Sequence, residues 1–140
     1  MTKADLFKFM AQQTLGVLGS ISPAGVPQSA LVGIAVTPEL EIVFDTVASS
    51  RKHANLLANP AASFVIGLGD QPEITVQFEG AARKPVGAEL ARYQQVYFAA
   101  WTDGPDRLSW PGIAYFVVRP KWIRYSDYDQ RPPLIEDFTF

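Results

Sequence analysis

The stretch "IVFDTVASSRKHANLLANPAASFVI", residues 42–66, predicts three consecutive elements. Its first residues are mostly apolar and favour a strand, and "AASFVI" at its end favours another. Between them, we expect a short helix from Ser50, with Ser49 or Ser50 as its N-cap, because serine is a preferred N-cap. Pro60 disfavours helical geometry at Asn59, so the helix should end before Pro60. The prediction is a strand–helix–strand unit.

The first turn of this helix carries two cations, Arg51 and Lys52. A helix N-terminus already has unpaired N–H groups and a partial positive charge, so each cation there costs about 0.3–1 kcal/mol. A bound anion would reverse that cost, because it would accept bonds from the N–H groups, the Ser50 hydroxyl and both cations. Thr46, at the end of the preceding strand, would add a hydroxyl. The residues alone leave two interpretations: a terminal-phosphate site or a solvated first turn.

The sequence on either side of this unit favours strands joined by short turns. Helices are expected at residues 4–13 and 86–100, and a loop at 101–112. Strands are expected at residues 14–21, 29–36, 41–46, 61–68 and 74–84, with a hairpin connection at 22–27 and turns at 37–40 and 69–73. Two further strands, 113–120 and 121–127, should form a hairpin-like pair, followed by an irregular tail at 128–140.

These connections are too short for repeated right-handed crossovers, which excludes a parallel α/β sheet. The predicted fold class is mostly β (α+β): a small antiparallel β-barrel with short flanking helices. The chain has 140 residues, 48% of them hydrophobic, which suits a single domain over residues 1–140.

Composition narrows the function classes. The formal net charge is −2 and the pI is about 5.3, so we expect no nucleic-acid partner. The absence of cysteine excludes thiolate chemistry and cysteine-based metal sites. The N-terminal stretch spreads charges among its apolar residues, and the apolar runs are too short to cross a bilayer. We therefore expect a cytoplasmic protein with no membrane partner.

Several segments in order resemble a known family. They are "SALVGIAV", then the stretch quoted above, and later "VQFEGAA". From about Thr14 to Tyr128 the chain resembles the pyridoxamine 5′-phosphate oxidase-like family of FMN-binding split barrels. The most specific piece is the strand–Thr–Ser-Arg-Lys–helix–Asn-Pro–strand unit. The resemblance implies a split barrel that binds FMN, and a homodimer with the cofactor at the subunit interface.

The resemblance also implies which residues contact the cofactor. In that family the Ser-Arg-Lys unit holds the FMN phosphate, and a neighbouring strand lies against the flavin ring. Carried over to this sequence, the phosphate contacts are Thr46, Ser50, Arg51 and Lys52. The flavin contacts are Ala30, Leu31 and Val32 on the strand that runs to Ala35, together with Thr75 and Gln77.

Other positions depart from the authentic oxidase. Ala30 and Ala35 stand where that enzyme has Arg and Lys, and Ser126 stands where it has Trp. The tail "RPPLIEDFTF" lacks the segment that grips pyridoxal. We therefore expect an FMN-dependent oxidoreductase that does not oxidise vitamin B6. Its electrons would come from a nicotinamide or another small-molecule substrate. The alternatives are a non-catalytic module that binds, stores or senses FMN or a deazaflavin, and a haem-binding protein.

The loop at residues 101–112 supplies candidate substrate contacts. Trp101 and Trp110 bracket it, and loops on a rigid scaffold often carry recognition. Either tryptophan would roof the flavin or the substrate, or both belong to an interface. Arg107 has two interpretations as well: it meets an anionic substrate, or it pairs with Asp103 or Asp106.

The sequence names no catalytic acid, base or metal ligand. His53 is the only histidine, and its neighbours offer no carboxylate for a metal site. We expect it on the surface of the helix. Tyr93, Tyr97 and Tyr115 are expected in the core or in a dimer interface.

Overall fold

The computed structural model describes residues 1–67, 69 and 73–140. The helices are α1 (Lys3–Ala11), α2 (Arg51–Ala58) and α3 (Gly87–Ala100), with a 3-10 helix, η1 (Gly104–Ser109). The strands are β1 (Leu15–Ile21), β2 (Pro27–Gly33), β3 (Ala35–Val36), β4 (Ile42–Val47), β5 (Ala61–Ile66), β6 (Ile74–Arg83), β7 (Ile113–Asp127) and β8 (Leu134–Thr139).

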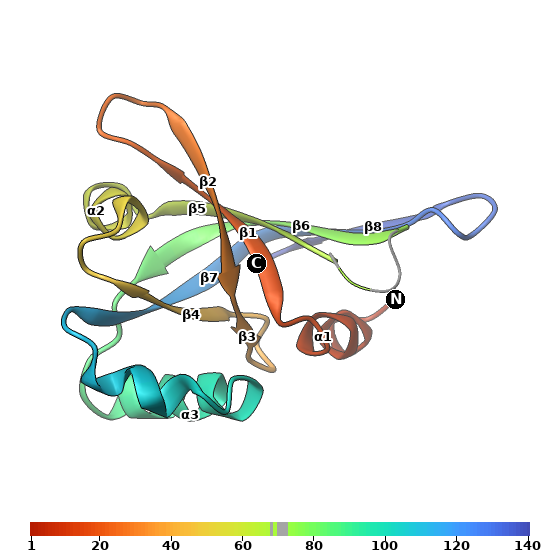
Figure 1. Cartoon of the computed structure of the whole chain (residues 1–140). Coiled ribbons are helices and arrows are strands. Elements are labelled where there is room, and N and C mark those ends of the chain that lie inside the picture. The colour runs from red at the N-terminus through yellow and green to blue at the C-terminus, as the bar shows by residue number, and fades with distance from the viewer. Residues whose placement is uncertain (68, 70–72) are drawn as a thin grey trace.

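The eight strands of the described chain form one antiparallel sheet that curls into a half-barrel (Figure 1). The strand order is β2-β1-β5-β6-β7-β4-β3, and β8 pairs with β7. The hairpin of β1 and β2 projects beyond the sheet beside α2, whereas α1 and α3 lie on the opposite side of the molecule (Figure 1). This arrangement confirms the predicted mostly β, split-barrel fold class.

The two edges of the sheet meet at a single residue. β2 begins the strand order and β3 ends it, yet only Ile34 separates them along the chain. The predicted strand over residues 29–36 therefore divides here, and its continuity closes the curl. At Gly33, just before the bend, an added Cβ would lie 2.7 Å from Cζ2 of Trp101. Glycine is required at this corner because the indole occupies the place of a side chain.

Two clusters of buried residues fill the structure. The larger lies inside the curl and is capped by α1, whose Leu6 and Met10 are fully buried. The smaller lies between α3 and strands β3, β4 and β7. It includes Tyr93, Tyr97 and Tyr115, which confirms their predicted burial.

The predicted break after Pro120 is wrong, because β7 is one strand of 15 residues. Pro120 lies opposite Gly80, where the register of β6 and β7 shifts. Proline is tolerated at such a bulge, since its missing N–H leaves no ladder hydrogen bond unmade.

The tail is not irregular throughout. Strand β8 pairs with β7 from Leu134 opposite Asp127 to Thr139 opposite Trp122. The predicted loop at residues 101–112 likewise contains the 3-10 helix η1. The predicted turn at residues 69–73 and the end of the strand predicted at 61–68 fall largely on residues 68 and 70–72, which lie outside the described residues.

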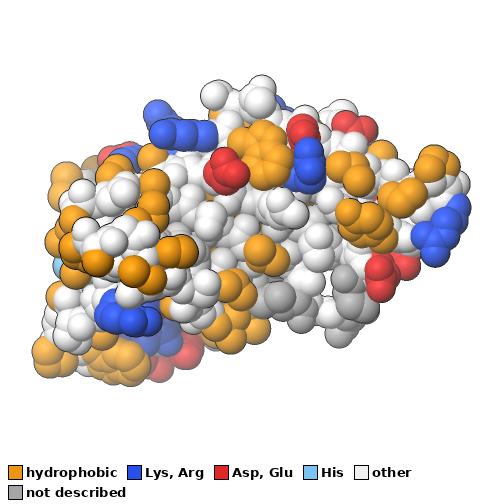
Figure 2. Space-filling view, turned by 90° about the horizontal axis from the view of Figure 1, so that it is seen from above, with side chains coloured by type: hydrophobic (Ala, Val, Ile, Leu, Met, Phe, Trp, Pro, Cys, Tyr) orange, Lys and Arg blue, Asp and Glu red, His pale blue; other side chains and the backbone are white. Residues whose placement is uncertain are grey.

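Among the residues that the structure describes, none of the helices has the length and apolar character that a bilayer crossing requires. Seen from above, one face of the molecule exposes several separate groups of hydrophobic side chains among charged ones (Figure 2).

Candidate functional site

Helix α2 begins as the sequence predicts. Ser50 is its N-cap, with extended backbone, and the Ser50 Oγ accepts a hydrogen bond of 3.3 Å from the His53 backbone N–H. The Thr46 Oγ1 lies 2.9 Å from the same Ser50 Oγ. Strand β4 thus ends with a hydroxyl that meets the cap of the following helix. The first-turn N–H groups and these two hydroxyls therefore lie close together.

A cavity of about 210 Å³ lies beside this helix start. It separates the first turn of α2 from the hairpin of β1 and β2. Within the described residues, neither cation that lines it enters an ion pair. Two cations and several polar groups therefore face one small space, which suits an anion. The lining residues are Ser20, Gln28, Ser29, Ala30, Arg51 and Lys52.

Asn55 fixes the hairpin to the helix and was not predicted as a site residue. Its buried amide donates to the Ser20 Oγ at 3.1 Å and to the Gln28 Oε1 at 2.9 Å. Ser20 and Gln28 are paired across β1 and β2. The one sequence signal was position: Asn55 lies four residues after Arg51, on the same helix face.

The predicted surface position of His53 is wrong. Its residue is only 8% exposed, and its ring packs edge-on against Phe116 with centroids 5.6 Å apart. The His53 Nε2 lies 3.3 Å from the Lys84 Nζ. Burial, and to a lesser extent the Lys84 charge, lowers the pKa of His53. The first turn of α2 faces inward at this position because Phe116 of β7 and Lys84, the residue after β6, pack against it.

The predicted flavin contacts fall on two faces of the sheet. Directly paired residues share a face, and Ala30 pairs with Leu18, which pairs with the buried Phe64. Ala30 therefore lies on the inner face, toward the cavity, as does the buried Val32 two residues on. Leu31 lies on the outer face and is 61% exposed.

Thr75 and Gln77 share the outer face of β6. Gln77 pairs with Val65, which pairs with Val17, and Val17 pairs with Leu31. β1 and β5 separate β6 from β2. Within one chain, Thr75 and Gln77 therefore do not join the cavity at α2.

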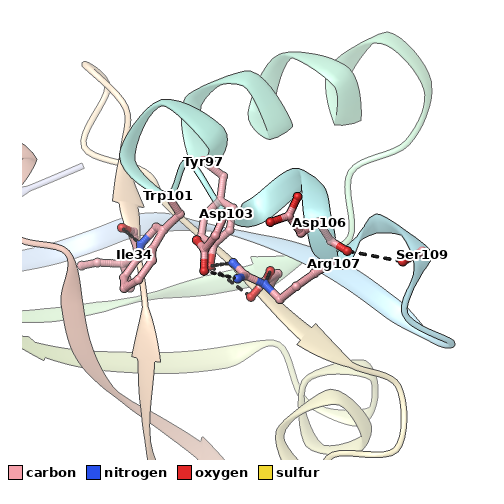
Figure 3. A network of polar contacts seen from close by, with 8 residues as sticks. Ile34, Tyr97, Trp101, Asp103, Asp106, Arg107 and Ser109 are labelled. Carbon is pink, nitrogen blue, oxygen red and sulfur yellow. Dashed lines mark hydrogen bonds and ion pairs between the residues drawn. The ribbon is translucent and has the colours of Figure 1, made fainter.

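The two tryptophans of the predicted substrate loop differ in environment. The Trp101 Nε1 donates to the Ile34 carbonyl oxygen at 3.0 Å (Figure 3). This bond holds the end of α3 on the barrel seam, the corner at Ile34 where β2 and β3 meet. Trp110 follows η1 and is 52% exposed. Trp101 thus has a structural contact, and Trp110 remains a predicted substrate contact.

Arg107 belongs to a network of internal contacts rather than standing free. Its Nε donates to the Asp45 Oδ2 at 2.8 Å, and its Nη1 donates to the Asp103 Oδ2 at 2.9 Å (Figure 3). Pairing with Asp103 confirms one predicted alternative. The Tyr97 hydroxyl donates to the Asp45 Oδ1 at 3.0 Å. Burial, followed by the Asp45 carboxylate, raises the pKa of Tyr97.

Asp45 directly precedes Thr46 in the chain, so the network also holds the part of β4 that carries the Thr46 hydroxyl. It ties α3 and η1 to the end of β4, where the hydroxyl of Thr46 is presented. In the part of the chain that the structure describes, no group of three His, Cys, Asp or Glu residues is arranged to hold a metal ion. The side chains that line the cavity at α2 suit an anion.

Comparison with known proteins places the fold. The family model described as pyridoxamine 5′-phosphate oxidase matches residues 2–127. No curated protein matches the chain. A heme binding protein from Mycobacterium smegmatis superposes with a TM-score of 0.84 at 20% identity, over 99% of this chain and 58% of that chain. This chain therefore spans little more than half of that relative.

Two further structures carry other descriptions. A pyridoxamine 5′-phosphate oxidase-related, FMN binding protein from Nostoc punctiforme superposes with a TM-score of 0.65 at 11% identity, over 91% of this chain and 86% of that chain. An F420 reductase superposes with a TM-score of 0.61 at 25% identity, over 84% of this chain and 94% of that chain. The family match covers most of the sequence, and the curled barrel agrees with it. The chain belongs to the pyridoxamine 5′-phosphate oxidase-like family of FMN-binding split barrels.

Proposed function

We propose that this chain binds FMN and is an oxidoreductase acting on a small organic molecule, with electrons exchanged with that substrate or with a nicotinamide. The observation that carries the proposal is the convergence of Thr46, Ser50, Arg51 and Lys52 at the start of α2, beside the cavity of about 210 Å³. Family membership supports the same cofactor.

The fit of these residues to a phosphate is chemical. The first-turn N–H groups and the Thr46 and Ser50 hydroxyls supply neutral donors. Arg51 supplies a planar fork for two phosphate oxygens, and Lys52 supplies a mobile charge. Asn55 holds the opposite wall in place through Ser20 and Gln28. Without an anion, Arg51 and Lys52 destabilise the helix start because they add to its positive charge. A bound phosphate would turn this repulsion into a stabilising interaction.

The cavity accommodates only part of a flavin nucleotide. Pockets that enclose a complete small-molecule ligand measure roughly 300–1,000 Å³, and this one measures about 210 Å³. A second wall is needed for the ring. We propose that it comes from a second copy of the chain, which would pack on the outer sheet face, where Leu31 and Val65 are 61% and 42% exposed, and reach past the edge strand β2 to the cavity. In such a homodimer, Thr75 and Gln77 on that face would approach the flavin from across the interface.

Bound FMN supplies the redox chemistry at its ring, and the residues here would hold and orient it. Asp45, locked by Tyr97 and Arg107, keeps the end of β4 and therefore the Thr46 hydroxyl in position. Trp110, half exposed at the end of η1, is the candidate substrate contact from the loop.

A specific observation favours one alternative cofactor. The F420 reductase is 25% identical over 84% of this chain, a higher identity than that of the FMN binding protein. A deazaflavin would use the same phosphate site. A non-catalytic binding or sensing module is the other alternative. Haem would need an axial ligand, and the single histidine, His53, is buried with its Nε2 against Lys84.

The first experiment is an absorbance spectrum of the purified protein and the mass of whatever heat releases. We expect flavin bands and the mass of FMN. The mass of F420 or haem would replace FMN with that group. Reduction of the holoprotein by NADH or NADPH would separate an oxidoreductase from a storage module.

Site mutagenesis tests the phosphate contacts. Arg51→Ala with Lys52→Ala should weaken FMN binding by at least about a hundredfold, because hydrogen bonds to charged groups are each worth about 1.5–3 kcal/mol. Lys8→Ala with Arg131→Ala removes the same charge at exposed positions and should leave affinity unchanged. If the folded Arg51/Lys52 variant binds FMN as tightly as the control, the phosphate site is elsewhere.

A further inference from the structure

A second cavity, of about 560 Å³, lies on the side of the molecule that carries α3. It is larger than the cavity at α2 and falls within the range of about 300–1,000 Å³ that encloses complete small-molecule ligands. Its walls come from the turn before β4, from β6, α3 and β7, and from Phe140 after β8. It shares no lining residue with the cavity at α2.

Four cations line this cavity: Arg83, Arg92, Arg119 and Lys121. Only Arg83 is neutralised by direct pairing, through its bidentate contact with Glu89. Within the described residues, the other three enter no ion pair. Three cations from two different elements therefore face one space without an ion-pair partner among the described residues.

Three glutamates line the cavity, and two of them already accept hydrogen bonds from neighbouring side chains. The buried Glu41 carboxylate accepts from the Tyr93 hydroxyl at 2.8 Å and from the Thr37 hydroxyl at 3.3 Å. Glu89 is held by Arg83 at 3.0 Å. Among the described residues, Glu39 alone of the three glutamates in the lining makes no such contact. The four cations and three carboxylates leave a net positive charge in the cavity.

The base of the cavity is rigid. Tyr93 is 1% exposed, and its ring carries the Arg92 guanidinium at 4.3 Å from the ring centroid. This stacking orients the Arg92 guanidinium beside the cavity. The hydrogen bond from Arg83, with smaller contributions from the Arg92 and Arg119 charges, lowers the pKa of Glu89. All three arginines line the same cavity.

The remaining wall is apolar. Pro120 and Phe140 line it, and Phe140 is about half exposed. The Phe140 backbone N–H donates to the Lys121 carbonyl oxygen at 3.2 Å, and the Lys3 ammonium lies 4.1 Å from the centroid of its ring. The aromatic side chain is thus held beside the cations, where it can meet the flat body of a ligand.

We propose that this cavity is a second ligand site, separate from the cofactor site, and that it binds a phosphate monoester with a ring-shaped body. A phosphate monoester carries a charge of about −1.5 to −2 at neutral pH. This charge complements Arg92, Arg119 and Lys121, which enter no ion pair within the described residues. Arginine forks match its oxygens in pairs. The ring would lie against Phe140 and Pro120, with the phosphate between Arg92 and Arg119.

Phenyl phosphate is the smallest probe that has both parts, and inorganic phosphate is its matched control. Titration calorimetry would use the Arg51→Ala, Lys52→Ala protein, so that the cavity at α2 contributes no anion binding. We expect one equivalent of phenyl phosphate to bind at least tenfold more tightly than inorganic phosphate. In NMR spectra of the wild-type protein, the probe should shift the signals of Arg92, Arg119 and Phe140.

Two variants then test the residues. Arg92→Gln with Arg119→Gln should weaken phenyl phosphate binding at least tenfold, and these exposed side chains enter no ion pair on which folding depends. Arg119→Lys keeps the charge but loses the fork, and should give an intermediate affinity. Equal binding of both probes, no binding at millimolar phenyl phosphate, or full binding by the Arg92/Arg119 variant would each overturn the proposal.

Discussion

Two tyrosines of the smaller buried cluster should change the stability of the protein in opposite directions when each is replaced by phenylalanine. Tyr97 and Tyr115 are both buried, and their rings pack edge-on with centroids 6.1 Å apart. The Tyr97 hydroxyl donates to Asp45 and accepts from the Arg107 Nη2 at 3.3 Å. The Tyr115 hydroxyl is buried with no hydrogen-bond partner among the residues that the structure describes. Substitution by phenylalanine therefore removes a satisfied group in one case and an unsatisfied group in the other.

The magnitudes follow from these contacts. Hydrogen bonds to charged groups contribute about 1.5–3 kcal/mol. Asp45 keeps its contact with the Arg107 Nε at 2.8 Å in the variant, so Tyr97→Phe should lower the free energy of unfolding by about 2 kcal/mol. A buried unsatisfied polar group costs about 1–3 kcal/mol. Tyr115→Phe removes that cost with little change in packing, so the free energy of unfolding should rise by about 1 kcal/mol.

Urea denaturation followed by tryptophan fluorescence measures both effects. With a denaturant slope of about 2 kcal/mol per molar urea, the midpoint should fall by about 1 M for Tyr97→Phe and rise by about 0.5 M for Tyr115→Phe. If Tyr115→Phe destabilises the protein as much as Tyr97→Phe, then the Tyr115 hydroxyl is hydrogen-bonded in solution and the assignment of an unsatisfied group is refuted.

Two further predictions concern single residues. NMR titration of the lone histidine should give a pKa below 6.5 for His53; the unfolded chain then binds the proton first, so stability should fall as the pH drops from about 6.5 toward the folded pKa. His53→Gln should remove that dependence, and an unshifted pKa would mean that His53 is solvated. Gly33→Ala should cost about 1–3 kcal/mol, because the new Cβ would overlap the Trp101 ring. Unchanged denaturation of this variant would show that the indole is free to move.

Local signals explain which elements the sequence predicted. Helix α2 has its cap at Ser50 and its stop at Pro60, so its bounds follow from neighbouring residues. Strand β8 was missed although its residues alternate between partly buried and exposed, because its formation depends on pairing with β7. Pro120 suggested a turn, yet its place opposite Gly80 makes it part of a bulge. That placement is set by register and not by local preference.

In the candidate site, too, local signals predicted some residues, whereas other contacts depend on the three-dimensional fold. Ser50, Arg51 and Lys52 were predicted because they are adjacent on one short helix, where charge and helix dipole conflict. The contact from Asn55 to Gln28 joins residues 27 positions apart, and the burial of His53 depends on Phe116 and Lys84, which are distant in the sequence. No periodicity in the sequence encodes such pairs, so they required the structure.

The seam at Ile34 has a consequence for motion. All other neighbours in the described sheet are held by ladders of backbone pairs, whereas the two edges are joined by the chain itself. The Ile34 carbonyl accepts from the Trp101 indole rather than from a strand. The barrel can therefore open at this corner when Trp101 lifts away, with the Ile34 N–H still bonded to the Thr14 carbonyl oxygen at 2.9 Å. We expect backbone amides around this corner to exchange with solvent through such local openings, well below the free energy of global unfolding.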